Sequence, residues 1–115
     1  NVPDDVEVFE INGPFFFGAA DKFKDTIRGL EKKPKVLILR MRHVPTIDAT
    51  GLSALENVLS LSKHDGTRII ISGLQPRPFK KIKQAGLLKD IEHHNIQPTI
   101  DHALDRARQI LAESG

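Results

Sequence analysis

Apolar residues recur along this 115-residue chain with two different periods. Runs of consecutive apolar residues at 36–39 and 69–71 are typical of strands buried on both faces of a parallel sheet. Segment 6–11 alternates apolar and acidic residues, as a half-exposed strand does. The pattern predicts strands at 6–11, 35–40 and 67–72, an edge strand within 91–96, and helices at about 19–32, 49–63, 78–85 and 100–111.

Strands and helices therefore alternate, which predicts an α/β fold. We expect one domain with a mainly parallel central sheet of four or so strands, flanked by about four helices and joined by right-handed crossovers. Two residues stand where helix N-caps belong. Asp48 precedes the second helix and Thr99 precedes the last one, and either side chain can accept a hydrogen bond from a free backbone N–H group.

Composition narrows the candidate chemistry. The chain has no cysteine, which excludes disulfides, thiolate metal sites and cysteine nucleophiles. Its net charge of +2 comes from 17 basic and 15 acidic residues, a near balance that gives little support for nucleic-acid binding. Four basic residues do cluster, at Arg77, Lys80, Lys81 and Lys83. We interpret them as the solvated face of a helix, with a contact to anionic lipid headgroups or to an acidic partner as the alternative.

Enzyme motifs are missing from the sequence. No Gly-x-Ser-x-Gly elbow, Gly-x-Gly-x-x-Gly loop or phosphate-binding Gly-x-x-x-x-Gly-Lys-[Ser/Thr] loop occurs. His64, His93, His94 and His102 lack the spacing of metal ligands. No apolar segment approaches the ~20 residues of a membrane span. We predict no enzymatic activity, no cofactor, no metal and no nucleic-acid partner.

The most informative motif is Asp48-Ala49-Thr50-Gly51-Leu52, which follows the buried strand and opens the second helix. From the residues alone it is a capped helix start, with Gly51 allowing a close backbone approach. The motif resembles the signature of the STAS domain, found in sulfate-type anion transporters and in anti-sigma factor antagonists. That family opens a helix with Asp-x-[Ser/Thr]-Gly-[Leu/Val]. The resemblance extends over nearly the whole chain in element order.

A second segment, from Gly13 to Phe23, looks like the transporter version of the domain, with an aromatic stretch before the first helix. Ala19 departs from that pattern, since many members carry Asn there. The resemblance implies the cytoplasmic C-terminal STAS domain of a bacterial SulP/SLC26-type sulfate permease, at the cytoplasmic face of the inner membrane. Residues 1–115 would then be a soluble piece of a longer membrane protein, an expectation that fits the first residue, Asn1, and the single methionine, Met41.

In that role the domain would regulate or assemble the transporter through protein contacts rather than catalysis. Its partners would be the transmembrane domain of the same polypeptide, a second copy joined through the transporter, or a cytosolic protein. The residues that we expect at this contact are Asp48, Thr50, Gly51, Leu52 and Phe16. The alternative function is a stand-alone anti-sigma factor antagonist, in which a kinase phosphorylates Thr50 and the partner changes.

Phe16 enters this set because three consecutive phenylalanines, residues 15–17, cannot all face one core from an extended segment. Alternation predicts that Phe16 is exposed while its two neighbours face inward. The other interpretation is that all three are buried under the first helix.

Overall fold

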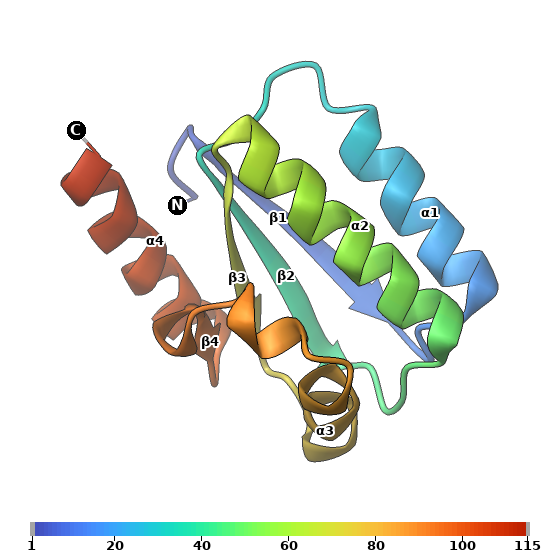
Figure 1. Ribbon diagram of the computed structural model, residues 1–115. Coiled ribbons are helices and arrows are strands. Elements are labelled where there is room, and N and C mark those ends of the chain that lie inside the picture. Colours follow the sequence, from blue (N-terminus) through green and yellow to red (C-terminus); the bar gives the residue numbers. More distant parts are fainter. Residues whose placement is uncertain (1, 115) are drawn as a thin grey trace.

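The structure is a computed structural model that describes residues 2–114. Four strands and four α-helices alternate along the chain (Figure 1). They are β1 (Val6–Asn12), α1 (Phe17–Arg28), β2 (Val36–His43), α2 (Ala49–Asp65), β3 (Arg68–Ser72), α3 (Pro76–Gln84), β4 (Ile96–Gln97) and α4 (Ile100–Ser114), with 3-10 turns at Leu87–Lys89 and His93–Asn95. The predicted α/β class is confirmed.

The strands form one parallel sheet in the order β1-β2-β3-β4. The two continuous apolar runs, β2 and β3, are the central strands, because both of their faces are covered. Ile38 of β2 lies between Val8 of β1 and Ile70 of β3. The alternating strand β1 is an edge strand, where a half-exposed pattern belongs.

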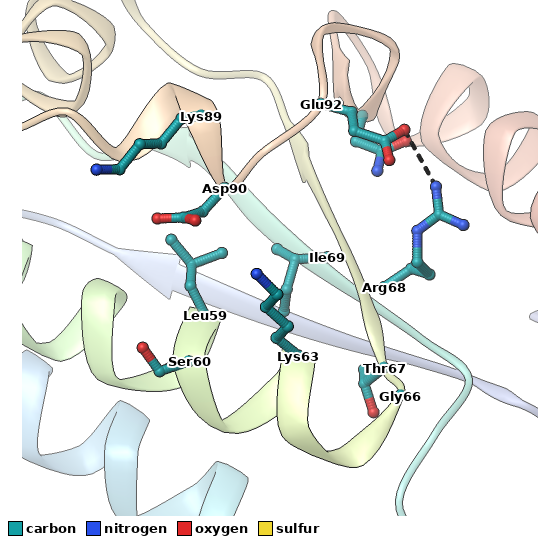
Figure 2. Close-up of a pocket in the computed structure, with 11 residues that line it drawn as sticks. Leu59, Ser60, Lys63, Gly66, Thr67, Arg68, Ile69, Lys89, Asp90 and Glu92 are labelled. Atoms are coloured by element: carbon teal, nitrogen blue, oxygen red, sulfur yellow. Dashed lines mark hydrogen bonds and ion pairs between the residues drawn. The ribbon is translucent and has the colours of Figure 1, made fainter.

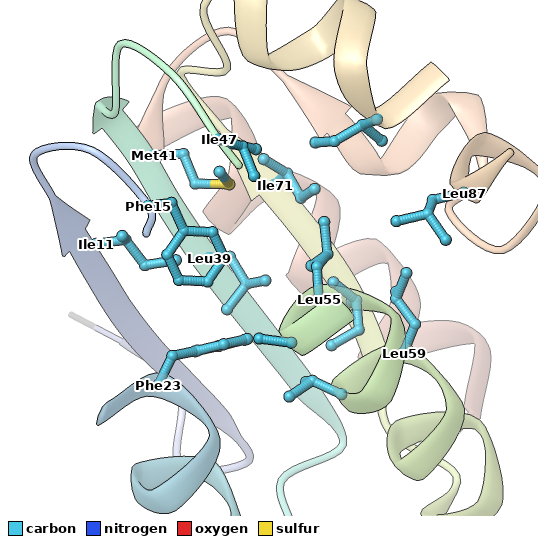
Figure 3. Packing of buried hydrophobic residues seen from close by; sticks show 14 of the residues in the cluster. Ile11, Phe15, Phe23, Leu39, Met41, Ile47, Leu55, Leu59, Ile71 and Leu87 are labelled. Atoms are coloured by element: carbon cyan, nitrogen blue, oxygen red, sulfur yellow. The ribbon is translucent and has the colours of Figure 1, made fainter. Parts of the chain in front are cut away.

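Helices cover both faces of the sheet (Figure 1). Alternate residues of β2 serve the two layers, because neighbouring side chains point to opposite faces. Leu37, Leu39 and Met41 belong to the larger core, which packs against α1 and α2 (Figure 3). Val36 and Ile38 belong to the smaller core under α4. All five of these side chains are buried.

Some predicted boundaries shift in the structure. Helix α1 ends at Arg28 rather than near Lys32, because Gly29 is a weak helix former and the next N–H group, that of Leu30, bonds the carbonyl of Ile27 in a tighter i→i−3 turn. Strand β2 runs on to His43, since β1 pairs with it up to Asn12. Helix α3 begins two residues early at Pro76, because proline suits the first turn of a helix.

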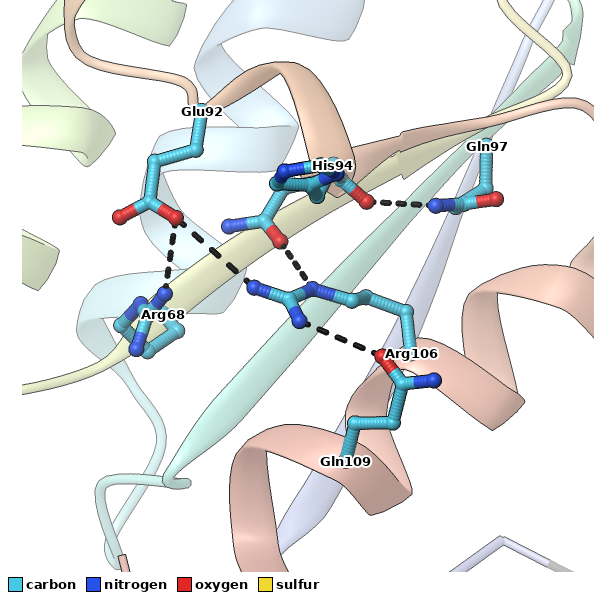
Figure 4. Close-up of polar contacts among 7 residues, drawn as sticks. Arg68, Glu92, His94, Gln97, Arg106 and Gln109 are labelled. Carbon is cyan, nitrogen blue, oxygen red and sulfur yellow. Dashed lines mark hydrogen bonds and ion pairs between the residues drawn. The ribbon is translucent and has the colours of Figure 1, made fainter. Parts of the chain in front are cut away.

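The edge strand predicted within 91–96 is reduced to the two residues of β4. The polar residues before it form a 3-10 turn, because Asn95 is buried and accepts a hydrogen bond from Nε of Arg106 at 2.8 Å. Glu92 lies 3.1 Å from Arg68 and 3.8 Å from Arg106 (Figure 4). This network fastens α4 to the start of β3. The Thr99 cap is confirmed, as its Oγ1 accepts from the N–H group of His102.

Candidate functional site

Helix α2 begins at the carboxyl end of the sheet, where its first turn is fixed by one side chain. Asp48 is in an extended conformation and its Oδ1 accepts from the backbone N–H of Gly51 at 2.9 Å. The hydroxyl of Thr50 donates to the same oxygen at 2.6 Å. The prediction that Asp48 is the N-cap is confirmed. The side chain of Thr50, the second residue of the helix, bonds the capping carboxylate.

These hydrogen bonds hold the pKa of Asp48 below its ordinary value. The bond from the Thr50 hydroxyl is the main cause and the bond from the Gly51 N–H is the second, since both stabilise the charged form. A carboxyl whose pKa is lowered by folding stabilises the protein above the pKa of the unfolded chain. That stabilisation is lost as the pH falls through the folded pKa.

Asp48→Ala is therefore expected to lower the melting temperature at pH 7, because the N–H of Gly51 loses its acceptor. Asp48→Asn is the matched control and should stay close to the wild type, since asparagine caps helices about as well as aspartate. The gap between wild type and Asp48→Ala should narrow as the pH falls below about 4. If all three proteins have the same melting temperature across this pH range, Asp48 does not stabilise the helix as its N-cap.

The Phe-rich loop and the motif helix meet at one point, which we call the Phe15–Gly51 junction. The N–H of Phe15 donates to Thr46 at 3.0 Å, and its carbonyl accepts from the N–H of Asp48 at 3.4 Å. Gly51 packs directly against the backbone of Phe15. A Cβ at position 51 would overlap the carbonyl oxygen of Phe15 and lie 2.8 Å from Cγ2 of Ile47. The two sequence motifs thus form a single structural unit.

The phenylalanine side chains divide at this junction. Phe15 is fully buried and its ring packs edge-on against Phe23, at 5.6 Å between centroids (Figure 3). Phe16 is 43% exposed, as predicted, but Phe17 is 67% exposed, against the prediction that it faces inward. Alternation holds only in an extended segment, and Phe17 is already the first residue of α1. The run of helix-forming residues from Ala19 onward is the sequence signal that a helix begins close to Phe17.

The five predicted contact residues lie together but differ in accessibility. Phe16, which follows Phe15, and Thr50, which precedes Gly51, are exposed, and Asp48 is half-buried. Gly51 is buried in the junction itself, and Leu52 is half-buried against the larger core. The surface open to a partner is therefore formed by the first residues of α1 and α2.

One residue at this site was missed by sequence reasoning. Lys81 is half-buried, and its Nζ donates to the carbonyl oxygen of Ile47 at 2.8 Å. The interpretation of the whole basic cluster as a solvated helix face is thus wrong at Lys81, although Arg77, Lys80 and Lys83 are exposed. The missed signal is helical spacing, which places Lys81 next to buried Pro78 on the helix surface.

The opposite end of the sheet holds a hollow of about 460 Å3 between the end of α2, the start of β3 and the Leu87–Lys89 turn (Figure 2). Its charged groups are mixed: Lys63, Lys89 and Asp90 line it, and Arg68 is paired with Glu92. A hydroxyl of the lining, that of Thr67, donates to the carbonyl oxygen of Pro34. Among its eleven lining residues, no nucleophilic side chain is hydrogen-bonded to a side chain that could act as its base.

Residues 2–114 contain no group of three or more His, Asp or Glu residues that could hold a metal ion. Within the same range, every helix is too short or too polar to cross a membrane.

The element order, the capped motif helix and the Phe-rich loop agree with one family. A family model of the STAS domain matches residues 1–103. The chain belongs to the STAS family. STAS domains of transporters are not a catalytic family, and the anti-sigma factor antagonist SpoIIAA shares the fold at 17% identity, with a TM-score of 0.78.

Three of the similar proteins carry sulfate-transporter or SulP names. YvdB of Bacillus subtilis (strain 168), whose name assigns it as a sulfate transporter, is 32% identical over 97 residues, which cover 78% of this chain and 18% of YvdB. The crystal structure of a sulfate transporter family protein from Wolinella succinogenes is 40% identical, with a TM-score of 0.92 over 97% of this chain and 92% of that one.

The STAS domain of the SulP transporter from Vibrio cholerae is 32% identical, with a TM-score of 0.84 over 98% of this chain and 88% of that one. The predicted homology to SulP-type STAS domains is confirmed. The chain spans less than a fifth of the length of YvdB, so its sequence corresponds to one part of that relative.

Proposed function

We propose that this STAS domain regulates or assembles a SulP-type anion transporter, as the cytoplasmic part of a longer polypeptide at the bacterial inner membrane. The similarity to sulfate-transporter STAS domains supports this assignment. The observation that carries it is the exposed surface at the Phe15–Gly51 junction. Phe16 and Phe17 follow Phe15 and are exposed, as is Thr50, the neighbour of Gly51, while the backbone beneath is held by hydrogen bonds.

Such a surface suits a protein contact for two physical reasons. Exposed aromatic side chains gain free energy when a partner buries them, and they lose little conformational entropy. The backbone beneath them is held by hydrogen bonds from Phe15, Asp48 and Lys81, so a partner meets a preformed surface. In this proposal the membrane domain of the same polypeptide is the first partner, and a second copy or a cytosolic protein is the next.

The test is anion uptake by the full-length protein that carries Thr50→Glu or Phe16→Ala. Thr50→Glu places a second carboxylate beside Asp48 at the contact, and Phe16→Ala removes apolar area from it. We expect either change to alter the initial uptake rate by about fivefold or more, the size of a typical coupling between sites. Both proteins should stay folded. Phe16→Ala should keep the melting temperature of the wild-type domain, whereas Thr50→Glu should melt slightly lower because Asp48 loses the bond from the Thr50 hydroxyl.

Two control variants match these changes. Ser60→Glu adds the same charge to an exposed position of α2, about 15 Å further along the helix. Val2→Ala trims another exposed apolar side chain. Both controls should transport normally. A lower amount of Thr50→Glu or Phe16→Ala protein in the membrane would assign the contact to assembly, and normal rates and amounts for both would contradict the proposal.

The alternative of an anti-sigma factor antagonist rests on the hydroxyl of Thr50, which is exposed at the second residue of α2. A phosphate there would add about −1.5 to −2 charges next to Asp48 and change the surface offered to a partner. Thr50→Val separates the two functions. In a transporter domain it should leave uptake close to normal, whereas in an antagonist it should abolish kinase-dependent release of the partner.

A further inference from the structure

The exposed face of α3 is basic and carries no acidic residue. Arg77, Lys80 and Lys83 lie on one side of the helix, and Pro78 and Ile82 are buried on the other. Segment 66–89 contains six Lys and Arg residues and no Asp or Glu. The cations of α3 therefore have no carboxylate on their own element to neutralise them.

Helix α3 lies beside the Phe15–Gly51 junction at the carboxyl end of the sheet (Figure 1). Two hydrogen bonds fix it there: Lys81 Nζ donates to the Ile47 carbonyl at 2.8 Å, and Gln75 Nε2 donates to the Arg42 carbonyl at 2.9 Å. The neighbouring strand end adds Arg42, whose charge is matched by Glu10 at 3.0 Å. The exposed cations of α3 thus add to Arg40, which lies opposite Glu10 in the sheet near the same end.

We propose that this basic face of α3, formed by Arg77, Lys80 and Lys83, docks on the anionic phospholipid headgroups of a bilayer. The inference rests on the proposed function, because a junction that contacts the membrane domain brings the adjacent α3 to the level of the headgroups. Charge complementarity favours an anionic lipid surface as the partner of this face. Each Lys or Arg close to such a surface contributes about 1 kcal/mol to the binding free energy. The attachment to the membrane domain supplies a high effective concentration of lipid.

The experiment is sedimentation of the 115-residue chain with vesicles of phosphatidylcholine and phosphatidylglycerol at low ionic strength. We expect binding that weakens as salt is added and is absent on vesicles of phosphatidylcholine alone. The variant Arg77→Gln/Lys80→Gln/Lys83→Gln should bind the anionic vesicles roughly 100-fold more weakly, from three contributions of about 1 kcal/mol each. Circular dichroism and melting should be unchanged, because the three side chains are exposed.

The matched control is Lys32→Gln/Lys33→Gln/Lys35→Gln, which removes the same charge from the loop at the opposite end of the sheet (Figure 1). It should bind within about twofold of the wild type if lipid contacts α3. Equal losses in both triple variants would mean a general attraction of net charge and would overturn the inference, as would a wild-type chain that ignores anionic vesicles. The assay contains no transporter, so its outcome is independent of the uptake result.

Discussion

Replacing Gly51 by alanine is expected to lower the free energy of unfolding by about 3 kcal/mol, at the upper end of overpacking effects. The added methyl would overlap the carbonyl oxygen of Phe15 and come within 3.0 Å of Cδ2 of its ring. A backbone oxygen cannot turn aside as a flexible side chain can. To make room, the loop must move and lose its hydrogen bonds to Thr46 and Asp48. Urea denaturation of the two proteins measures the difference.

Gly18→Ala is the control for this substitution. Gly18 lies in the first turn of α1, and a Cβ there would meet nothing within 4 Å. Alanine should leave the free energy of unfolding unchanged or raise it by up to about 1 kcal/mol, because glycine is the weaker helix former. If both glycine variants behave alike, position 51 has room for a side chain and the junction is looser than the structure indicates.

The order of elements could be predicted from sequence because the two kinds of apolar pattern are well separated here. The continuous runs in β2 and β3 identify the central strands, and the alternating run in β1 identifies an edge. The cap at Asp48 could be predicted as well, since its side chain acts within three residues of its own position. An interaction between residues this close in the chain can be predicted from a short segment of sequence.

Features that depend on distant residues could not be predicted in the same way. The 3-10 turn before β4 forms because Asn95 bonds Arg106, eleven residues further along the chain. Lys81 donates to Ile47 across 34 residues, so neither position signals the bond by itself. Glycine at position 51 indicated a close approach, but the partner that approaches, the backbone of Phe15, becomes evident only from the fold.

Phe15→Ala is expected to have the largest effect of all, a loss of about 3–5 kcal/mol in the free energy of unfolding. The Phe15 ring is fully buried, packs against Phe23 and covers Gly51, so its removal leaves a cavity under the start of α2. Domains of this size are stable by about 5–15 kcal/mol, so the substitution removes a large share of the stability of the domain. Chemical denaturation at 25 °C is the measurement.

Phe17→Ala is the matched control, two residues away and with the same loss of atoms. Phe17 is 67% exposed, so little apolar area leaves the core and the free energy of unfolding should change by less than about 0.5 kcal/mol. The contrast decides how the Phe-rich loop is used. A large effect at Phe15 alone means that one ring anchors the motif helix while its neighbours remain available for a partner. Similar losses at both positions would mean that Phe17 is also part of the core, and Phe16 would remain the aromatic side chain of the proposed contact surface.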